Sequence, residues 1–461
     1  MKIIVLNGSP KGDESVTMQY IKYIQKKFIN HELKIINIAY KINQLEKDEK
    51  FFNEIIDEIN NCHGVIWGFP VYFCLVSSQY KRFIELIFER NVQYAFKDKY
   101  TSLLCTSINY FDHTAINYMN SICDDLEMNF IDYFSAKMMD LKNKECRKLL
   151  ILFAENFFNG IETKVATLKN YRELSYKPVN YSSVGITKNI DNGDKKILII
   201  ADTLDNNNLK NMVYRFKSIF TKNIDLVLLE DISIKGGCLG CIKCGYSYKC
   251  AYTDKDSYID FVNTKVRSAD IILFAGAIND RYLSSMWKKF YDRLFFNTHT
   301  PSISGKQVAW IISGPLSQIP NIKEIIDGLN QWQISNLVGF LTDEYNTCEE
   351  IDDRIYCLAK SLVNLSNKNY IKPMTYLGKG GIKIFRDDIY ADLRFPFVAD
   401  HKAFKDMGIY DFPHKRYLSI IRNSILIFLS KFPKFRNEIY SNQIKVSMIK
   451  PFKKILENPK L

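Results

Sequence analysis

The sequence contains an internal repeat, and this repeat constrains the fold more than any other feature. Lys2–Asn7 reads KIIVLN and resembles KILIIA at Lys196–Ala201, 194 residues further on. Ser77–Phe83 (SSQYKRF) resembles Ser284–Phe290 (SSMWKKF), here 207 residues further on. The second copy has therefore gained 13 residues between the two landmarks, the length of the span from Cys238 to Cys250. Two copies of one plan predict two similar domains in tandem.

Within each copy, short apolar runs alternate with stretches of helical periodicity. Strands are expected at 2–7, 34–39, 64–69, 101–107 and 129–136, and again near 196–201, 225–229, 270–275, 307–313 and 337–342. In the first copy helices are expected near 15–28, 50–61, 76–90, 112–126 and 143–158. This alternation predicts an α/β fold, with two doubly wound parallel sheets of strand order 2-1-3-4-5 that carry helices on both faces.

The same patterns predict four regions. Residues 1–163 and 195–368 are expected to form the two domains, and 164–194, which contains Pro178 and two glycines, reads as a linker. From 369 to 461 the alternation ends, and Gly378–Gly381 is expected to mark a turn into a different segment. This C-terminal extension is basic, because residues 371–461 hold 18 Lys and Arg against 8 Asp and Glu. Such a surface suits an acidic redox partner, an anionic membrane or nucleic acid, of which nucleic acid is the least expected. The alternative is a solvated surface without a partner.

The N-terminal residues argue for a cytoplasmic protein. Met1 and Lys2 run directly into an apolar strand, with neither the apolar core nor the cleavage site of a signal peptide. The apolar run at 425–429 is far shorter than the roughly 20 residues of a transmembrane helix. Disulfides are therefore not expected. The seven cysteines outside the span 238–250 are expected to be buried small residues; they are Cys62, Cys74, Cys105, Cys123, Cys146, Cys348 and Cys357.

The loop after the first strand has the composition of a phosphate site. Gly8–Thr17 supplies glycines, which allow close approach of the backbone, and hydroxyl groups that bind phosphate oxygens. In a parallel sheet this loop opens a helix whose N-terminal N–H groups favour an anion. The contacts expected here are Ser9, Pro10, Lys11, Ser15 and Thr17. An ordinary turn with Ser15 as the helix cap remains the alternative.

Two further loops are expected at the same edge of the sheet. Pro70, Val71, Tyr72 and Phe73 follow the third strand and can support a planar ring with aromatic and rigid groups. Thr106, Ser107 and Asn109 follow the fourth strand and add polar contacts. Buried aromatic residues at a strand end are the alternative for the first of these loops.

These residues resemble the NAD(P)H-dependent FMN reductase family of flavodoxin-like proteins. The resemblance rests on Gly8–Lys11, Ser15–Thr17 and Pro70–Tyr72 ahead of a helix with Lys81, and is looser over residues 195–365. It implies two flavodoxin-like domains, with FMN bound in the first. The FMN phosphate would lie on the serine and threonine loop, and the flavin ring would lie against Pro70–Tyr72. The second copy reads Ala201-Asp202-Thr203 in place of the phosphate loop. A carboxylate about 4 Å from a phosphate charge costs about 4 kcal/mol, so this copy is expected to bind no FMN of its own.

Four cysteines lie within the inserted span, at Cys238, Cys241, Cys244 and Cys250. Thiolates at these short intervals suit a cuboidal iron-sulfur cluster, and the spacing resembles that of the iron-sulfur flavoproteins, whose [4Fe-4S] cluster exchanges single electrons with FMN. Zinc and a loop without metal are the alternatives. Because cofactor loop and cysteine loop belong to different copies, we expect the copies to form an internal pseudo-dimer that brings them together.

The function predicted from these motifs is an FMN-dependent oxidoreductase. A nicotinamide, NADH or NADPH, reduces the flavin, and electrons pass on, with or without the cluster, to a small molecule or a redox protein. No protein side chain is expected to be catalytic, and the six histidines are assigned no role. Two alternatives are an electron-transfer protein that takes electrons from ferredoxin without NAD(P)H, and a flavin-free binding module with a basic tail.

Overall fold

The computed structural model describes residues 1–185, 189–222 and 224–457. The first sheet is parallel with the order β2-β1-β3-β4-β5. Its strands are β1 (Lys2–Asn7), β2 (Glu32–Asn37), β3 (Gly64–Pro70), β4 (Tyr100–Ser107) and β5 (Asn129–Lys137). The helices are α1 (Val16–Lys27), α2 (Ile42–Lys47), α3 (Glu49–Asn60), α4 (Ser78–Glu89), α5 (Asp112–Asp125) and α6 (Lys144–Thr163). The predicted order 2-1-3-4-5 is confirmed, with strand ends shifted by at most two residues.

The second sheet repeats this plan in the order β7-β6-β8-β10-β11. Its strands are β6 (Ile197–Ala201), β7 (Ile224–Leu228), β8 (Ile271–Asn279), β10 (Gln307–Ser313) and β11 (Asn336–Thr342), and the short β9 (Tyr282–Leu283) pairs antiparallel with β8. The helices are α7 (Asn207–Ser218), α8 (Tyr258–Phe261), α9 (Ser285–Leu294), α10 (Pro320–Trp332) and α11 (Cys348–Asn367). The chain therefore folds as two tandem flavodoxin-like α/β domains.

The sequence repeat extends to the way in which helices begin. Ser77 caps α4 by accepting a hydrogen bond from the N–H of Tyr80, and Ser284 caps α9 by accepting one from the N–H of Trp287. Such a cap satisfies one of the N–H groups that a helix leaves free at its start. Because each cap follows directly on the turn after the third strand of its sheet, both helices start at the same point of the fold.

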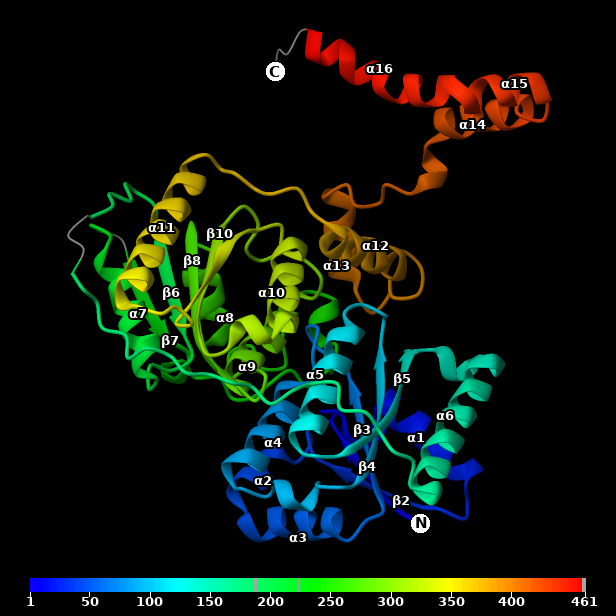
Figure 1. The fold of residues 1–461 in the computed structure, drawn as a ribbon, viewed down its shortest axis with the longest axis vertical. Coiled ribbons are helices and arrows are strands. Elements are labelled where there is room, and N and C mark those ends of the chain that lie inside the picture. Colours follow the sequence, from blue (N-terminus) through cyan, green and yellow to red (C-terminus); the bar gives the residue numbers. More distant parts are fainter. Residues whose placement is uncertain (186–188, 223, 458–461) are drawn as a thin grey trace. The chain divides into compact units, whose positions relative to one another are not determined.

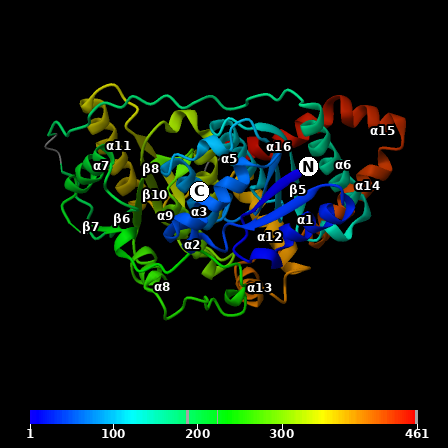
Figure 2. The same ribbon diagram turned by 90° about the horizontal axis from the view of Figure 1, so that it is seen from below.

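Three hydrophobic cores organise the two domains. One lies under α1 and α6 on the outer face of the first sheet, and another under α7 and α11 on the outer face of the second. The third is shared: side chains from α3, α4 and α5 join those from α9 and α10 in one continuous cluster between the sheets. Figure 1 shows α4, α5, α9 and α10 between the two sheets, and Figure 2 shows α5 and α9 there from a second direction. The two domains are thus packed through their inner helices.

The contact between α4 and α9 is reciprocal. The N–H of Ser78 donates to Asp292 at 2.7 Å, and the N–H of Ser285 donates to Glu85 at 2.5 Å. Ser285 and Asp292 lie 207 residues after Ser78 and Glu85, the offset of the sequence repeat. Each acceptor also pairs with a lysine one turn earlier on its own helix, Lys81 at 3.2 Å from Glu85 and Lys288 with Asp292. Such exchange of equivalent contacts is the pattern of a twofold interface and agrees with the expected pseudo-dimer.

The linker between the domains is extended over its described residues, 164–185 and 189–194, and two phenols fix it to the second domain. The hydroxyl of Tyr176 donates to Asp343 at 2.5 Å, and that of Tyr181 donates to Asp352 at 2.5 Å. Asp352 is fully buried and also accepts from Arg215 at 3.1 Å. The linker therefore packs along the second domain instead of only connecting it to the first.

One expectation about the C-terminal extension was wrong. Gly378–Gly381 does not form a turn but lies inside helix α12 (Tyr376–Tyr390). The reason is packing: a Cβ at Gly378 would lie 2.8 Å from Gln331 of α10, and one at Gly381 would lie 2.5 Å from the ring of Tyr110. The glycines let α12 approach its neighbours closely, which outweighs their cost of about 1 kcal/mol each within a helix.

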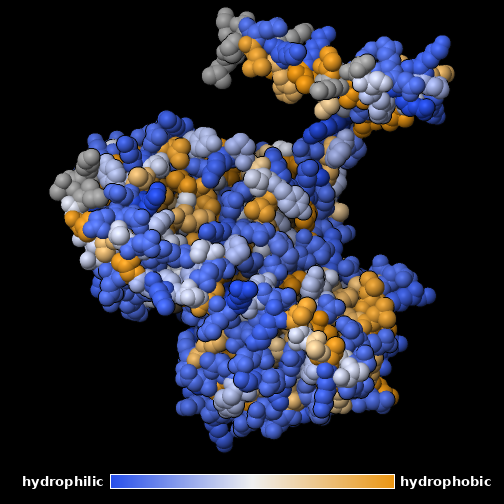
Figure 3. Space-filling model, viewed as in Figure 1, coloured by the Kyte–Doolittle hydropathy of each residue, from blue (hydrophilic) through white to orange (hydrophobic). Residues whose placement is uncertain are grey.

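The chain divides into two compact units, Met1–Ala403 and Phe404–Leu461. The second unit contains α14 (Tyr417–Leu429), α15 (Pro433–Glu438) and α16 (Ile444–Glu457), whereas α13 (Val398–Asp406) spans the boundary. Helix α14 buries none of its residues, and Figure 3 shows hydrophobic side chains at the surface of these helices. Among the described residues, no helix is both long and apolar enough to cross a membrane.

The cysteines outside the inserted span follow the expectation in part. Cys62, Cys74, Cys105 and Cys123 are buried within the first domain. The expectation fails for Cys357, which is exposed, because it lies on the face of α11 away from the sheet.

Candidate functional site

A large, mostly apolar cavity lies at the carboxyl edge of the first sheet, where ligands bind in open parallel sheets. Its volume is about 440 Å³, within the range of small-molecule and cofactor sites. Three parts of the chain line it. They are the strand-end loops of the first domain; the cysteine loop, the segment Asp292–His299 and helix α10 of the second domain; and residues 385–397 of the extension. A site of one domain is therefore closed by the other two parts of the chain.

The loop after β1 supplies the polar end of the cavity. Ser9, Ser15 and Thr17 are almost fully buried, and all three line the cavity. The hydroxyl of Ser15 accepts from the N–H of Met18, which leaves the N–H groups of Val16 and Thr17 directed out of the helix end. Lys11, which is exposed, contributes the one lysine among the lining residues. This donor set fits a phosphate: hydroxyls, helix N–H groups and one ammonium.

A tight turn forms the next wall. Tyr72 and Leu75 exchange both backbone hydrogen bonds, at 2.7 and 3.0 Å. Phe73 and Cys74 between them have φ of 40° and 65°, a left-handed conformation that is uncommon for residues other than glycine. The hydroxyl of Thr114 fixes the turn by donating to the carbonyl of Cys74 at 2.6 Å. The turn thereby holds Val71, Tyr72 and Phe73 against the cavity.

Most of the residues predicted from the sequence meet at this cavity. Those that line it are Ser9, Lys11, Ser15, Thr17, Pro70, Val71, Tyr72, Phe73, Thr106 and Ser107. Pro10 and Asn109 lie in the same loops but not among the lining residues. The N–H of Asn109 instead donates to Ser107 at 2.8 Å, so Asn109 helps to shape its loop. The roles of all twelve residues stay predictions.

The cysteine loop lies directly against these loops of the first domain. The side-chain amide of Gln79 donates to the carbonyl of Cys238 at 3.2 Å. Gly240, with φ of +63°, has no room for a side chain, because a Cβ there would overlap the hydroxyl of Tyr72. Cys238 lines both the large cavity and a small hollow within the cysteine loop. The two motifs that the sequence places in different copies are therefore in contact.

All four cysteines of the loop line this small hollow. Its volume is about 20 Å³, which is room for one water molecule and not for a four-iron cluster. Within the described part of the chain, no three His, Cys, Asp or Glu side chains are arranged to hold one metal ion. Burial raises the pKa of the Cys238 and Cys244 thiols to about 12, so both are protonated in this arrangement. The donor set fits iron or zinc, whereas the space does not.

The third wall is aromatic, and none of its residues is among the site residues predicted from the sequence. Phe385 of α12 lies 4.4 Å from the ring of His299 and 4.5 Å from that of Trp332, and Phe397 lies 4.9 Å from His299, all between ring centroids. Gly245 of the cysteine loop packs against the carbonyl of Pro396, which connects this wall to that loop. The aromatic residues among 385–397 were the available signal, but nothing in their spacing indicates which domain they contact.

The equivalent edge of the second sheet holds carboxylates and is occupied by the linker. Asp202 follows β6 at the position of Gly8, and burial raises its pKa to about 6. Asp343, fully buried at the end of β11, accepts hydrogen bonds from Tyr176, Asn208 and Ser313. Carboxylates repel a phosphate, and the phenol of Tyr176 contacts Asp343 and Ser313 at this edge.

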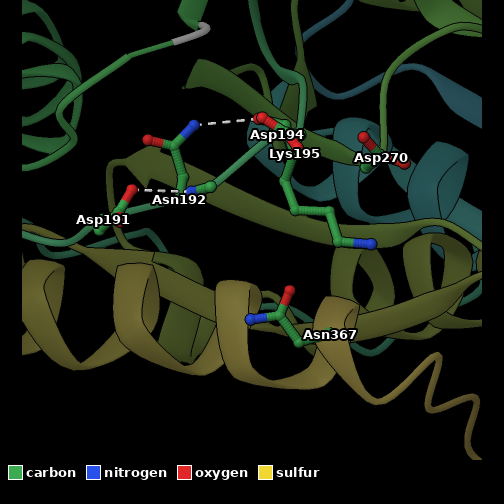
Figure 4. A pocket seen from close by; sticks show the side chains of 7 residues that line it. Asp191, Asn192, Asp194, Lys195, Asp270 and Asn367 are labelled. Carbon is green, nitrogen blue, oxygen red and sulfur yellow. Dashed lines mark hydrogen bonds between the residues drawn. The ribbon is translucent and has the colours of Figure 1, made fainter.

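A separate hollow lies at the opposite end of the second sheet (Figure 4). It is lined by Asp191, Asn192, Lys195, Asp270 and neighbouring polar residues, and its volume is about 570 Å³. The amide of Asn192 donates to the carbonyl of Lys195 at 3.0 Å, which closes the turn before β6. Because this is the amino end of the strands, where parallel sheets do not bind cofactors, we assign it no role.

Comparison with known proteins relates the first domain to flavoproteins. Residues 1–135 match the family model described as NADPH-dependent FMN reductase. Among solved structures, an NADH:FMN oxidoreductase in its apo form is 16% identical, with 37% of this chain and 96% of that chain covered and a TM-score of 0.31. FerB, a flavoenzyme NAD(P)H:(acceptor) oxidoreductase from Paracoccus denitrificans, is 18% identical, with 35% and 97% covered and a TM-score of 0.30. General stress protein 14 from Treponema denticola, in complex with FMN, is 9% identical, with 35% and 98% covered and a TM-score of 0.26. No curated protein matches the chain.

Proposed function

We propose that this chain is an FMN-dependent NAD(P)H oxidoreductase that binds one FMN in the large cavity. The observation that carries the proposal is the convergence of three strand-end loops, after β1, β3 and β4, on a single cavity of about 440 Å³. The family match over residues 1–135 covers the same three loops. The second domain contributes walls to this site and binds no FMN itself.

The residues around the cavity fit FMN at both of its ends. Ser9, Ser15, Thr17 and the start of α1 hold the phosphate, while the ammonium of Lys11 balances its charge. Val71, Tyr72 and Phe73 lie along the ring, with Thr106 and Ser107 at its polar edge. The hydroxyl of Thr17 forms a hydrogen bond of 2.7 Å with that of Thr106, which ties the phosphate loop to the loop after β4.

Bound FMN supplies the redox chemistry, by accepting a hydride from NAD(P)H and passing electrons to an acceptor. The protein's part is to bind the cofactor, exclude water and leave one face open for the nicotinamide. The aromatic wall and the cysteine loop exclude water, because they cover the cavity on the side away from the first sheet. Asp292, which also lines the cavity, is neutralised by Lys288 and by the N–H of Ser78 and adds little negative charge there.

We further propose that the cysteine loop binds a [4Fe-4S] cluster in a more open arrangement. Two features support this. All four cysteines line one hollow, and Ile242 between them has φ of 59°, a strained conformation for a β-branched residue. Cluster binding would displace the protons of Cys238 and Cys244. Zinc is the competing occupant, since four thiolates suit it equally.

A titration with FMN tests the main proposal. The expected result is one FMN per chain, with quenching of its fluorescence and a dissociation constant in the micromolar range or below. Steady-state assays with NADH and NADPH then separate an NAD(P)H oxidoreductase from a protein that takes electrons only from reduced ferredoxin. A protein that takes up no FMN would refute the proposal and leave the flavin-free binding module.

Iron and sulfide analysis of anaerobically reconstituted protein tests the cluster. We expect about four iron atoms and four sulfides per chain, and loss of both in Cys241→Ser. Cys357→Ser is the matched control, because Cys357 is also exposed but lies on α11, outside the loop. If the wild-type protein contains zinc and no sulfide, the loop is a zinc site and the cluster proposal fails. If iron persists in Cys241→Ser, Cys241 is not a ligand.

A further inference from the structure

The cavity wall contains one histidine, and a buried carboxylate fixes its orientation. His299 lines the cavity and is 7% exposed. Its Nδ1 lies 2.7 Å from Asp400, which is fully buried. Among the described residues the ring has no other hydrogen-bond partner, so the Nε2 edge is left for the cavity. Histidine is the side chain best suited to donate a proton near neutral pH.

The position of His299 is set by a small network around Asp400. This carboxylate accepts from the N–H of His299 at 3.1 Å, from the hydroxyl of Thr298, and from that of Thr300 at 3.1 Å. Thr298 has φ of 50° and ψ of −116°, which is strained for a β-branched residue. Backbone strain of this kind persists where the surroundings hold it and is concentrated at functional sites. The strain turns the chain so that His299 faces the cavity.

The surroundings of His299 indicate what it faces. The rings of Phe385 and Phe397 lie against it, and Trp332 and Phe295 extend the same wall. A planar, mostly apolar molecule fits such a wall, and His299 is the hydrogen-bond donor in reach of a polar atom at its edge. The opposite end of the cavity carries the hydroxyls and lysine assigned to the cofactor phosphate. The histidine therefore lies apart from the polar groups of that end.

We propose that His299, oriented by Asp400, donates a proton to the acceptor that this enzyme reduces, a planar ring compound with a carbonyl oxygen. This rests on the proposed function, which supplies the reductant. In this scheme His299 is an imidazolium, with Nδ1–H on Asp400 and Nε2–H toward the acceptor. The acceptor gains a hydride from the reductant, which brings two electrons and one hydrogen, and it gains a proton from Nε2–H. Both carbonyl groups of a quinone then become C–OH groups as the ring turns aromatic: one O–H bond holds the hydrogen that arrived as hydride and the other holds the proton from His299, which is left as neutral imidazole. The imidazole then regains its proton from water as the product leaves. Asp400 is a positioning residue in this scheme.

Two acceptors separate proton transfer from electron transfer. Reduction of 1,4-naphthoquinone requires protons, whereas reduction of ferricyanide takes up none. In FMN-loaded His299→Gln we expect naphthoquinone reduction to fall about a hundredfold or more, while ferricyanide reduction and the FMN dissociation constant change less than about twofold. Asp400→Asn should also lower the rate of naphthoquinone reduction relative to that of ferricyanide reduction. His113→Gln is the matched control, because His113 also pairs with a carboxylate, Glu324 at 2.9 Å, but is exposed and lies outside the cavity.

Equilibrium binding gives a second readout that needs no turnover. Naphthoquinone is titrated against the protein without NAD(P)H, and quenching of tryptophan fluorescence, to which Trp332 in the cavity wall contributes, is measured. Glutamine keeps an N–H donor and should keep the affinity, whereas His299→Phe should weaken binding about tenfold through the lost hydrogen bond.

The outcomes that overturn the inference are distinct from failure of the proposed function. If His299→Gln reduces both acceptors at wild-type rates, or loses both together with FMN affinity, His299 is not the proton donor. If the wild-type protein binds no FMN, the proposed function fails. In that case the binding experiment on the cofactor-free protein still decides whether His299 contacts the acceptor.

Discussion

The two copies of the fold keep one turn and use it in opposite ways. In the first domain Phe73 and Cys74 have φ of 40° and 65°, and 207 residues later Asp280 and Arg281 have φ of 47° and 60°. The first turn lines the cavity. The second instead binds the other domain, because Asp280 pairs with Lys81 at 3.4 Å and Arg281 with Asp125 at 2.5 Å. The two turns thus share a backbone conformation, but the side chains of the first face the cavity of the proposed FMN site and those of the second contact the other domain.

The edges beside these turns differ in the same sense. The first presents Ser9, Ser15 and Thr17, whereas the second presents Asp202 and Asp343. A site near a helix N-terminus favours an anion only if no fixed carboxylate is nearby. From this comparison we expect that two or three side chains decide which copy of a duplicated flavodoxin-like domain can bind a phosphate. Exchange of those side chains is the most direct way to test it.

The largest effect is expected when the first edge is made like the second. Ser9→Asp introduces a carboxylate into the phosphate loop, at a residue that is 1% exposed. At about 4 Å and an effective dielectric of 20, its repulsion of the phosphate costs about 4 kcal/mol, which is nearly a thousandfold in the FMN dissociation constant. Titration followed by FMN fluorescence measures it.

Thr203→Asp is the matched control, because Thr203 holds the position of Ser9 in the second domain. It should leave FMN affinity unchanged. Equal losses in the two variants would contradict the assignment of one phosphate site to the first domain. Circular dichroism of Ser9→Asp must match the wild type for the comparison to be valid.

The next effect concerns the paired lysines of the domain interface. Lys288 and Asp292 are both fully buried, whereas Glu85, the partner of Lys81, also accepts from Arg82 at 3.0 Å. Lys288→Met leaves a buried carboxylate without its cation and should cost about 3 kcal/mol of unfolding free energy. Lys81→Met should cost less, because Arg82 still pairs with Glu85, and Asp280, the second partner of Lys81, is only partly buried. Urea denaturation compares the two; equal losses would show that the two halves of the interface are electrostatically equivalent.

The sequence predicted the sheets well because their signals are local. Buried strands such as β1 and β6 are short apolar runs, and the offset of 207 residues between Ser78 and Ser285 relates the helices that meet at the interface. The loops after β1, β3 and β4 were found because parallel strands bring their carboxyl ends to one edge. Given the order of the strands, the position of these loops followed directly.

What the sequence did not predict depends on contacts between distant segments. Asp400 meets His299 across 101 residues, and Gly381 packs against Tyr110 across a longer separation. The glycines inside α12 predicted a turn because glycine has a low local propensity for helix. The structure shows that Gly381 is needed for the close approach of the Tyr110 ring to the helix. His299 belongs to no recognisable motif, so its role could not be predicted before the structure showed Asp400 beside it.

A smaller effect is expected from the buried carboxyl of the second edge. The pKa of Asp202 is raised from 3.8 to about 6, chiefly by burial. The folded protein therefore holds this proton more tightly than the unfolded chain, so stability from this group falls as the pH rises from 3.8 through 6 and stays lower above it. Asp202→Asn should match the wild type near pH 4 and be more stable by about 2 kcal/mol at pH 8. Asp205→Asn, exposed in the same loop, is the control, and a constant difference across pH would contradict the assignment.

The smallest effect is expected from removal of residues 417–461. These residues belong to the unit Phe404–Leu461, and every residue that lines the large cavity lies at or before Phe397. FMN affinity and ferricyanide reduction should therefore stay within about twofold of the full chain. Removal from residue 376 onward should instead weaken FMN binding, because it takes away α12 and the wall formed by Phe385 and Phe397 and admits water to the cavity. If the shorter deletion also abolished FMN binding, the C-terminal helices would have a part in the site that the cavity alone does not account for.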